Sequence, residues 1–439
     1  MGHFISTTKD QQQEMLRESG YESFDALFES VPEEVRLKSG LRVPKGCSEL
    51  EAGRKLAAMA AKNQVFPHIF RGAGAYCHYI PAIVKSVTAK EDFLTAYTPY
   101  QAEISQGNLQ SIFEFQTMIC ELTGMETANA SVYDGAAAAA EGVLMCRDRK
   151  RLTVLVSATT PPQVLETIRT YCWGRNAQML IVPEKDGETD REALASMMDE
   201  TVACLYVQQP NYYGILEKAE ELGTIVHEKG GKYVMGCNPI ALALMQTPGE
   251  CKADVAVGEG QLLGMPLGFG GPYLGFMAAS KEMMRKLPGR IVGETTDSEG
   301  KRGYVLTLQA REQHIRREKA SSNICSNQAL CAMTASVYLS AMGAAGLTQA
   351  AVQCTSKAHY LRDRLMEAGL KPVYDRPFFH EFVTDCPTDP KKLMNHLAEH
   401  GYLGGLVLPD RKILWCATEM NPKEEMDELT SLVKEVCAE

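Results

Sequence analysis

Helical and strand-like hydrophobic patterns alternate between residues 110 and 244. Apolar residues recur at helical spacing in 111–123 and in 162–174. Short apolar runs with the length of buried strands stand between such helices, at 152–158, 179–183, 204–210 and 232–237. Strand–helix alternation of this kind is typical of a mainly parallel sheet with helices on both faces. The central part of the chain is therefore predicted to be a large α/β domain.

The segments on either side have different patterns. The chain before it reads as short helices followed by a loop rich in Gly and aromatic residues, at 67–81. After 328, a long apolar helix leads into three strand candidates and two amphipathic helices. We therefore predict an N-terminal helical arm (1–84), the large α/β domain (85–328) and a small C-terminal α+β domain (329–439).

Composition narrows the class of protein. The 439 residues are 45% hydrophobic and 23% charged, as in ordinary globular proteins, and the net charge of −10 disfavours nucleic acid and anionic membranes as partners. Fourteen Cys occur without any C-x-x-C pair, so the spacing predicts reduced thiols and no metal site. We see no targeting segment and no apolar run of about 18 residues, which favours a cytoplasmic protein without a membrane partner.

The three predicted parts together resemble the aminotransferase fold, fold type I of the pyridoxal-phosphate-dependent transferases. Such an enzyme needs a lysine on a loop after a late strand to form the Schiff base. It also needs an acidic residue, roughly 25 to 30 positions earlier, that faces the pyridine nitrogen. Here the strand 232–237 ends in Met235-Gly236-Cys237, and Gln261 stands near the expected lysine position. Lys319 lies far downstream on a charged stretch. The sequence thus predicts the fold without its own cofactor chemistry.

Three longer motifs point to a family. The stretches YTPYQAEISQG (97–107), GFGGPYLGF (268–276) and REQHIRREKASSNIC (311–325) resemble the glycine cleavage system P-protein, and in particular subunit 1 of its two-subunit form. The resemblance extends from about residue 20 to residue 416. It implies decarboxylation of glycine through a pyridoxal-phosphate adduct and transfer of the aminomethyl group to the lipoyl arm of H-protein.

The resemblance also implies a division of labour. In the two-subunit form the lysine that binds pyridoxal phosphate covalently belongs to subunit 2, and the expected assembly is α2β2. Aligned on GFGGPY, Gln261 takes the position of that lysine. Cofactor binding by a Schiff base in this chain is therefore not expected.

Candidate site residues cluster in 97–107. Tyr97, Tyr100, Gln101 and Glu103 are predicted to line a site shared with the partner subunit, because a proline-fixed turn with several polar tips suits a preorganised site. Tyr97 and Tyr100 are the first candidates as hydrogen-bond donors to the cofactor or the substrate carboxylate. The alternative is a Tyr-rich packing loop.

Other polar segments leave alternatives open. The loop 69–81, with His78, is either the mouth of a site or structural. Asp134 opens a helix where relatives of this fold bind the cofactor phosphate, but an anion there would repel phosphate, so we predict a helix cap. Arg311, His314 and Arg317 are expected on one face of a helix, either solvated or binding an anion or an interface.

Three functions are compatible with these observations. The first is an enzyme subunit that is active only with its lysine-bearing partner. The second is a self-sufficient pyridoxal-phosphate decarboxylase or aminotransferase homodimer, against which the missing lysine and acid count. The third is a non-catalytic scaffold or regulatory paralogue, in which the 97–107 motif would be expected to have drifted.

Overall fold

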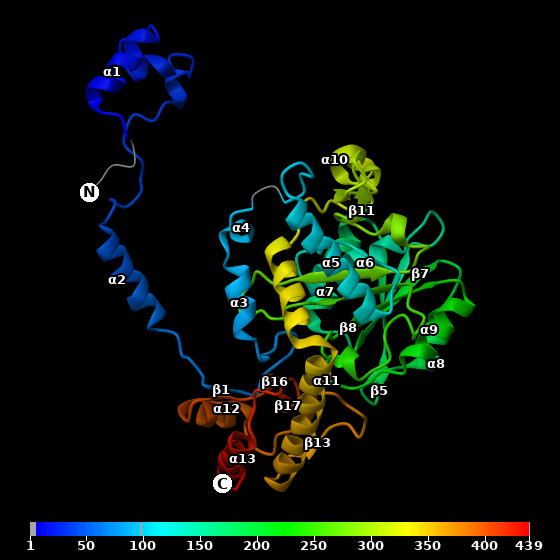
Figure 1. Cartoon of the computed structure of the whole chain (residues 1–439). Helices are drawn as coiled ribbons and strands as arrows, with labels where there is room; N and C mark the ends of the chain where they lie inside the picture. Colours follow the sequence, from blue (N-terminus) through cyan, green and yellow to red (C-terminus); the bar gives the residue numbers. More distant parts are fainter. Residues whose placement is uncertain (1–5, 97–98, 439) are drawn as a thin grey trace. The chain divides into compact units, whose positions relative to one another are not determined.

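The structure, a computed structural model, describes residues 6–96 and 99–438. The chain separates into two compact units, with the division between Val65 and Phe66 (Figure 1). The boundaries predicted after residues 84 and 328 remain predictions.

The first unit is a series of short helices without a core of its own. Its elements are α1 (Lys9–Glu18), the 3-10 turns η1 (Asp25–Phe28) and η2 (Glu33–Val35), and α2 (Glu49–Ala60). Thr8 and Ser48 begin the two α-helices with capping boxes, which satisfy backbone N–H groups that a helix leaves free. Of the residues described in this unit only Leu16 is buried. Apolar side chains along it are therefore exposed, among them Phe28, Leu41 and Val65.

The second unit is built on a seven-stranded sheet, counted over the described residues, with the order β2-β10-β9-β8-β7-β3-β4. Its strands are β2 (Thr127–Ala128), β3 (Thr153–Ser157), β4 (Gln178–Val182), β7 (Val202–Gln209), β8 (Lys232–Cys237), β9 (Val255–Glu259) and β10 (Gly275–Ala279). The neighbouring strands β4, β3, β7, β8 and β9 pair in parallel. Strand β10 is antiparallel to both of its neighbours, β9 and β2. The predicted mainly parallel sheet is confirmed.

Alternation along the strands explains why helices cover both faces. Val154 and Val156 of β3 pack into a core with α6 (Gly135–Met145) and α7 (Pro162–Gly174). Leu155, between them, packs into a separate core with α8 (Arg191–Met197) and α9 (Ala219–Glu228). Successive strand residues point to opposite faces, so a continuously apolar strand needs cover on both.

The remaining described helices and strands before residue 309 belong to neither of these two cores. They are β1 (His68–Ile69), α3 (Ala82–Thr88), α4 (Glu91–Leu94), α5 (Gln106–Thr123), β5 (Glu184–Lys185), β6 (Glu188–Thr189), η3 (Ala241–Ala243), η4 (Met284–Lys286), β11 (Val292–Thr296) and β12 (Arg302–Leu306). The antiparallel β11–β12 hairpin, which the hydrophobic pattern did not predict, packs against α5.

A smaller four-stranded antiparallel sheet follows in the C-terminal region, with the order β13-β14-β17-β16. Its elements are β13 (Lys371–Pro372), β14 (Glu381–Asp385), α12 (Pro390–Glu399), β15 (Tyr402–Leu403), β16 (Leu406–Leu408), β17 (Lys412–Cys416) and α13 (Lys423–Cys437). Strand β15 pairs in parallel with β1, which ties residues 68–69 to this region. The expected α+β pattern after residue 328 is present.

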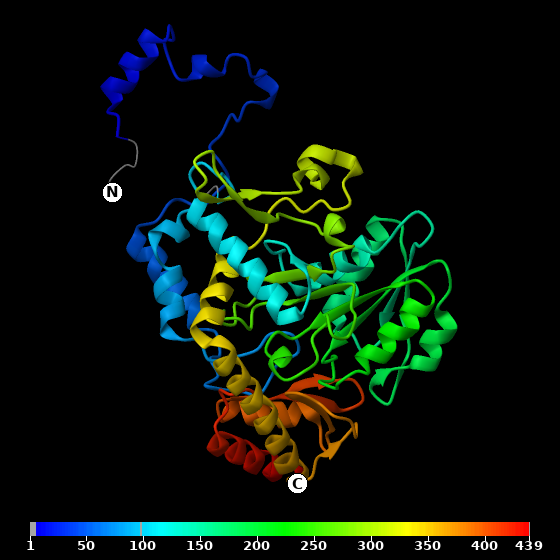
Figure 2. The ribbon, with the colours of Figure 1, turned by 45° about the vertical axis from the view of Figure 1, so that its right-hand side comes forward.

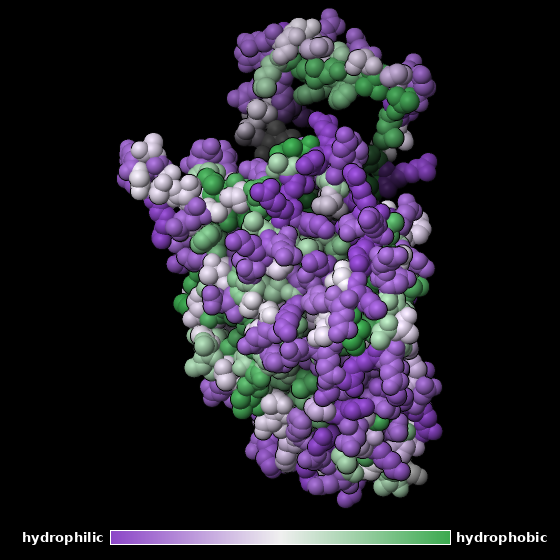
Figure 3. Space-filling model, turned by 90° about the vertical axis from the view of Figure 1, so that its right-hand side faces the viewer, coloured by the Kyte–Doolittle hydropathy of each residue, from purple (hydrophilic) through white to green (hydrophobic). Residues whose placement is uncertain are grey.

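The helix α11 (Ala329–Glu367) connects the large and small sheets, as Figure 2 shows in yellow and orange. It is the one described helix that is long and apolar enough to cross a membrane by length and composition. It is broken at Gly343, whose φ of 60° is not helical, and it packs against α3, α5 and α13. Because of this packing we interpret α11 as a helix of the interior of the fold. Polar side chains predominate on the face of the molecule shown in Figure 3.

The expectation of one helix through Arg311, His314 and Arg317 is wrong. The segment forms three short pieces, η5 (Gln309–Arg311), α10 (Gln313–Arg316) and η6 (Arg317–Lys319). Arg317 has a φ of 54°, which interrupts helical geometry. Arg311 instead donates to the Gly289 carbonyl oxygen at 2.7 Å.

Candidate functional site

A cavity of about 330 Å³ lies where the carboxyl ends of β7, β8 and β9 meet the start of α6. Parallel α/β sheets bind their ligands at this edge because the loops there diverge. The small C-terminal region contributes His380 and Glu381 to the lining, and a loop after β1 contributes residues 72–76. Of the described residues that line the cavity, none is Lys or Arg.

Gln261 lies beside this cavity and is fully engaged. Only 1% of it is exposed. Its Nε2 donates to the carbonyl oxygens of Tyr76, at 3.0 Å, and Met265, at 2.7 Å, while its Oε1 accepts from the Tyr76 N–H at 3.0 Å. The side chain expected at the lysine position therefore fixes the loop after β1 to the loop after β9.

Glu259, the last residue of β9, directs its carboxylate to the start of α6. Its Oε2 accepts from the Gly135 N–H at 2.9 Å, and its Oε1 accepts from the N–H groups of Gln261 and Leu274 at 2.9 and 3.0 Å. Burial raises the pKa of Glu259 to about 7, although the three backbone donors favour its ionised form. A helix N-terminus favours an anion, and here a side chain of the same chain supplies it.

Asp134 accepts a hydrogen bond from a second backbone N–H group at the start of α6. Its Oδ1 accepts from the Ala137 N–H at 2.7 Å, which confirms the predicted helix cap. With Glu259 bonded to Gly135, two carboxylates occupy the first turn of α6. A phosphate placed there would meet negative charge instead of free N–H groups.

The loop over the cavity is held from a third side by Glu381. This carboxylate accepts from the Ala73 N–H at 2.6 Å and from the Tyr76 hydroxyl at 2.7 Å. Burial raises the pKa of Glu381 to about 7. Residues 72–76 are thus tied both to the large sheet, through Gln261, and to the small sheet.

No acidic residue stands at the end of β8, where an acid that faces the pyridine nitrogen was expected. Strand β8 ends at Cys237, which is buried and donates to the Val257 carbonyl oxygen at 3.4 Å. Burial raises the pKa of its thiol, so Cys237 stays neutral. Pyridoxal phosphate needs a lysine, a phosphate cradle and an acid that faces its pyridine nitrogen. Among its described lining residues, this cavity has no lysine, its helix start is occupied by carboxylates, and β8 ends in Cys237 instead of an acid. The residues present do not fit the cofactor.

The predicted site segment lies elsewhere on the chain. Tyr97 is outside the described residues. Tyr100 is partly buried, its hydroxyl donates to Asn327 Oδ1, and Arg290 lies over its ring at 5.2 Å. Burial raises the pKa of Tyr100 to about 12. Gln101 and Glu103 are exposed.

None of Tyr100, Gln101 and Glu103 lines the cavity. The base of their segment is anchored by Gln106, whose side chain bonds the backbone of Ala102 and Tyr304. The exposed positions are therefore carried on a fixed backbone. Their role in a site shared with a partner remains a prediction.

Sequence reasoning missed Glu259 and Glu381. Glu259 had one available signal, an acidic residue at the end of an apolar strand and two positions before the lysine position. Glu381 had none, because it approaches the cavity from the small sheet, 305 residues after Tyr76. His78, left open between site and structure, pairs with Glu419 at 2.8 Å and does not line the cavity.

Comparisons with known proteins agree over nearly the whole chain. Residues 2–433 match the family model described as glycine cleavage system P-protein. A probable glycine dehydrogenase (decarboxylating) subunit 1 from Desulfitobacterium hafniense is 47% identical, covering 99% of this chain and all of the relative. One from Moorella thermoacetica is 48% identical, with the same coverage of each chain.

Solved structures give the same result. A glycine decarboxylase (P-protein) of the glycine cleavage system, crystallised in inhibitor-bound form, superposes with a TM-score of 0.93 at 41% identity, covering 99% of this chain and 100% of that one. An alanine–glyoxylate aminotransferase from a Nostoc species superposes with a TM-score of 0.60 at 16% identity, covering 92% of this chain and 98% of that one. The second likeness shows the fold alone, and it confirms the predicted fold type I architecture.

Proposed function

Because the chain belongs to the glycine cleavage system P-protein family, we propose that it is the subunit of a two-subunit glycine decarboxylase that does not hold the cofactor. The proposed reaction decarboxylates glycine and transfers the aminomethyl group to the lipoyl arm of H-protein. Pyridoxal phosphate would be held by the lysine of the partner subunit, and the proposed assembly is α2β2.

The observation that carries this proposal is the filled strand-end edge. The amide nitrogen and oxygen of the Gln261 side chain are both hydrogen-bonded to backbone groups. The carboxylates of Glu259 and Asp134 bind N–H groups in the first turn of α6. A chain of this family that can neither form the Schiff base nor cradle the phosphate depends on another chain for both. The relatives designated subunit 1 support the existence of a second subunit.

The exposed polar side chains in 99–107 are the part of this chain that would line the site shared with the partner subunit. Gln101 and Glu103 extend from a backbone that Gln106 and Tyr100 anchor, so their side chains are available to a partner without rearrangement of the core. Ile104 beside them is 70% exposed, as expected for a surface that another chain covers. These residues would position substrate, while the electron-accepting chemistry belongs to the cofactor.

We further propose a cytoplasmic location. All fourteen cysteines are described, and each is a free thiol, as expected in a reducing compartment.

Reconstitution tests the proposed function. The purified chain, the candidate lysine-bearing subunit and their mixture are each assayed for carbon dioxide release from labelled glycine, with pyridoxal phosphate and lipoylated H-protein present. We expect activity from the mixture alone. Activity of the lone chain would favour the self-sufficient homodimer. An active partner that gains nothing from this chain would favour the scaffold or regulatory paralogue.

A further inference from the structure

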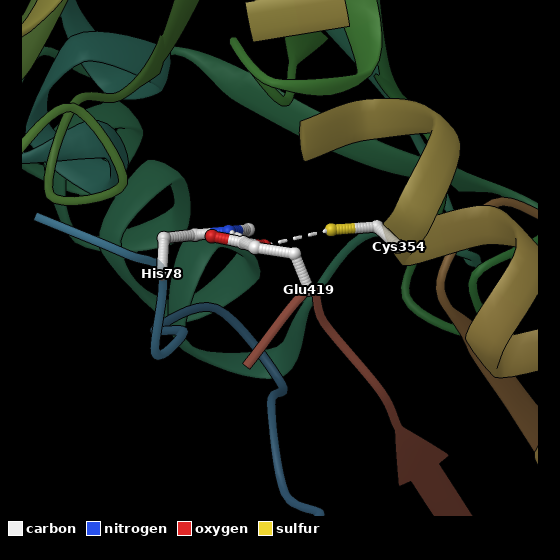
Figure 4. Close-up of side chains that lie close together, drawn as sticks. All are labelled: His78, Cys354 and Glu419. Atoms are coloured by element: carbon white, nitrogen blue, oxygen red, sulfur yellow. Dashed lines mark hydrogen bonds and ion pairs between the residues drawn. The ribbon is translucent and has the colours of Figure 1, made fainter. Parts of the chain in front are cut away.

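Outside the cavity, three side chains from distant parts of the second unit converge in its interior. They are His78 from the loop between β1 and α3, Cys354 from α11 and Glu419 from the segment after β17 (Figure 4). One ligand atom from each lies within 4.8 Å of the others. His78 Nδ1 is 2.8 Å from Glu419 Oε2, and Cys354 Sγ donates to the same oxygen at 3.1 Å.

The group is enclosed. The side chains of His78 and Glu419 are 2% and 9% exposed, and Cys354 is buried. The second oxygen of Glu419 accepts from the Tyr79 N–H at 2.7 Å, which fixes the direction of the carboxylate. Lys357 donates to the backbone oxygen of Glu419 and leaves the carboxylate to the other two side chains. Structural metal sites have this closed character.

Several buried polar atoms near the group have no hydrogen-bond partner among the described residues. They are Nε2 of His78, both ring nitrogens of His380 and the hydroxyl of Tyr338. The His78 and His380 rings are stacked with centroids 6.5 Å apart. Native proteins pair most buried polar groups, and an orphaned donor or acceptor costs about 1–3 kcal/mol. His78 directs its other ring nitrogen, Nδ1, to Glu419, so Nε2 of His78 and the two nitrogens of His380 are left for a further ligand close to the thiol and the carboxylate.

We propose that His78, Cys354 and Glu419 bind a structural zinc ion, with His380 as the candidate fourth ligand. Zinc takes Cys sulfur, His nitrogen and carboxylate oxygen. One thiolate and one carboxylate balance the charge of Zn²⁺, so the bound cluster is neutral and suits a buried place. Binding forms the metal–sulfur bond as Cys354 gives up its thiol proton to solvent.

The absence of a zinc motif in the sequence does not oppose this proposal. Glu419 lies 341 residues after His78 and 65 after Cys354, so no local spacing could reveal the set. The ion would connect α11, the segment after β17 and the loop after β1. That loop also carries Tyr76, the partner of Gln261, so the proposed zinc supports the wall of the cavity.

The test uses the full untagged chain with Cys47 and Cys325 changed to Ser, which removes its two exposed thiols. After treatment with a chelator, the protein is titrated with Co²⁺ and then with Zn²⁺. We expect one equivalent of Co²⁺ to give a sulfur-to-metal charge-transfer band that Zn²⁺ abolishes, and the midpoint of thermal unfolding to rise with Zn²⁺.

Cys354→Ser should remove the band and weaken Zn²⁺ binding by on the order of 100-fold or more. Cys172→Ser, at another buried thiol, is the matched control. This variant should keep both the charge-transfer band and the affinity for Zn²⁺. A folded parent protein that gives no band and no stabilisation by Zn²⁺ would overturn the proposal, whatever the variants do. A band that survives in Cys354→Ser would overturn the assignment of the sulfur.

Discussion

The polar side chains at the strand-end cavity are bonded within the chain, whereas those of the segment 99–107 are exposed to solvent. At the cavity, Glu259 in its lining and Gln261 beside it are bonded to backbone N–H and C=O groups of the chain itself. In the segment, Gln101 and Glu103 are exposed on an anchored backbone. The comparison teaches that polar residues at the strand-end edge of this fold can be bonded entirely within the chain and stabilise it. If the cofactor belongs to another chain, as proposed, the function of this chain is expected at its exposed segment.

The largest effect is expected from Gln261→Leu. The substitution leaves Tyr76 N–H, Tyr76 C=O and Met265 C=O without their present partner in the interior. Each unpaired group costs about 1–3 kcal/mol, so the free energy of unfolding should fall by on the order of 4 kcal/mol. Urea unfolding of the chain measures the change.

The control is Gln178→Leu at an exposed position of β4, where we expect a change within about 0.5 kcal/mol. An equally small change for Gln261→Leu would show that Gln261 does not hold the two loops together. The description of the cavity as a structural region would then fail.

A smaller effect is expected from the titration of Glu259. Its pKa in the folded chain is raised to about 7 from 4.5, so between these values the folded state keeps a proton that the unfolded state loses. Stability from this group is therefore full below about pH 4.5, declines as pH rises to about 7 and then levels off. The total is about 3 kcal/mol, at about 1.4 kcal/mol for each unit of pKa.

Glu259→Gln removes this ionisation, and urea unfolding from pH 5 to 8 measures the difference from the parent chain. We expect the stability of the parent relative to the variant to decline across that range. Glu200→Gln, at an exposed position, controls for the loss of a carboxyl group. A flat difference would contradict the burial of the Glu259 carboxyl.

The smallest free-energy change, but the clearest for function, is expected from Gln101→Ala and Glu103→Ala. Both side chains are exposed, so the stability of the chain should change by less than about 0.5 kcal/mol. If each hydrogen-bonds to substrate or cofactor across the interface, kcat/KM for glycine in the assembled enzyme should fall about tenfold, which is about 1.4 kcal/mol. Glu399→Ala, exposed on α12, is the control.

Unchanged activity in both variants would favour the packing-loop interpretation of the segment. A loss of activity together with a loss of stability would place the effect in the fold and not in the shared site.

The sequence predicts the elements that are local and misses contacts between distant segments. Strand β8 and helix α7 coincide with the predicted ranges because apolar periodicity is a property of neighbouring residues. The missing lysine was visible because its position follows from a local motif. Glu381 and Glu419 were not, since their partners Tyr76 and His78 lie more than 300 residues away. The prediction of one helix in 311–320 was wrong because the positive φ of Arg317 interrupts the helix that the periodicity indicates.

The central claim is that this chain works in a cofactor site that it does not carry. The most direct measurement is the visible absorption of the chain with pyridoxal phosphate, alone and with the lysine-bearing subunit, followed by borohydride reduction and mapping of the labelled lysine. We predict that the lone chain gains no stoichiometric label and that the mixture is labelled at one lysine of the partner. Stoichiometric label on a lysine of this chain, such as Lys319, would contradict the account.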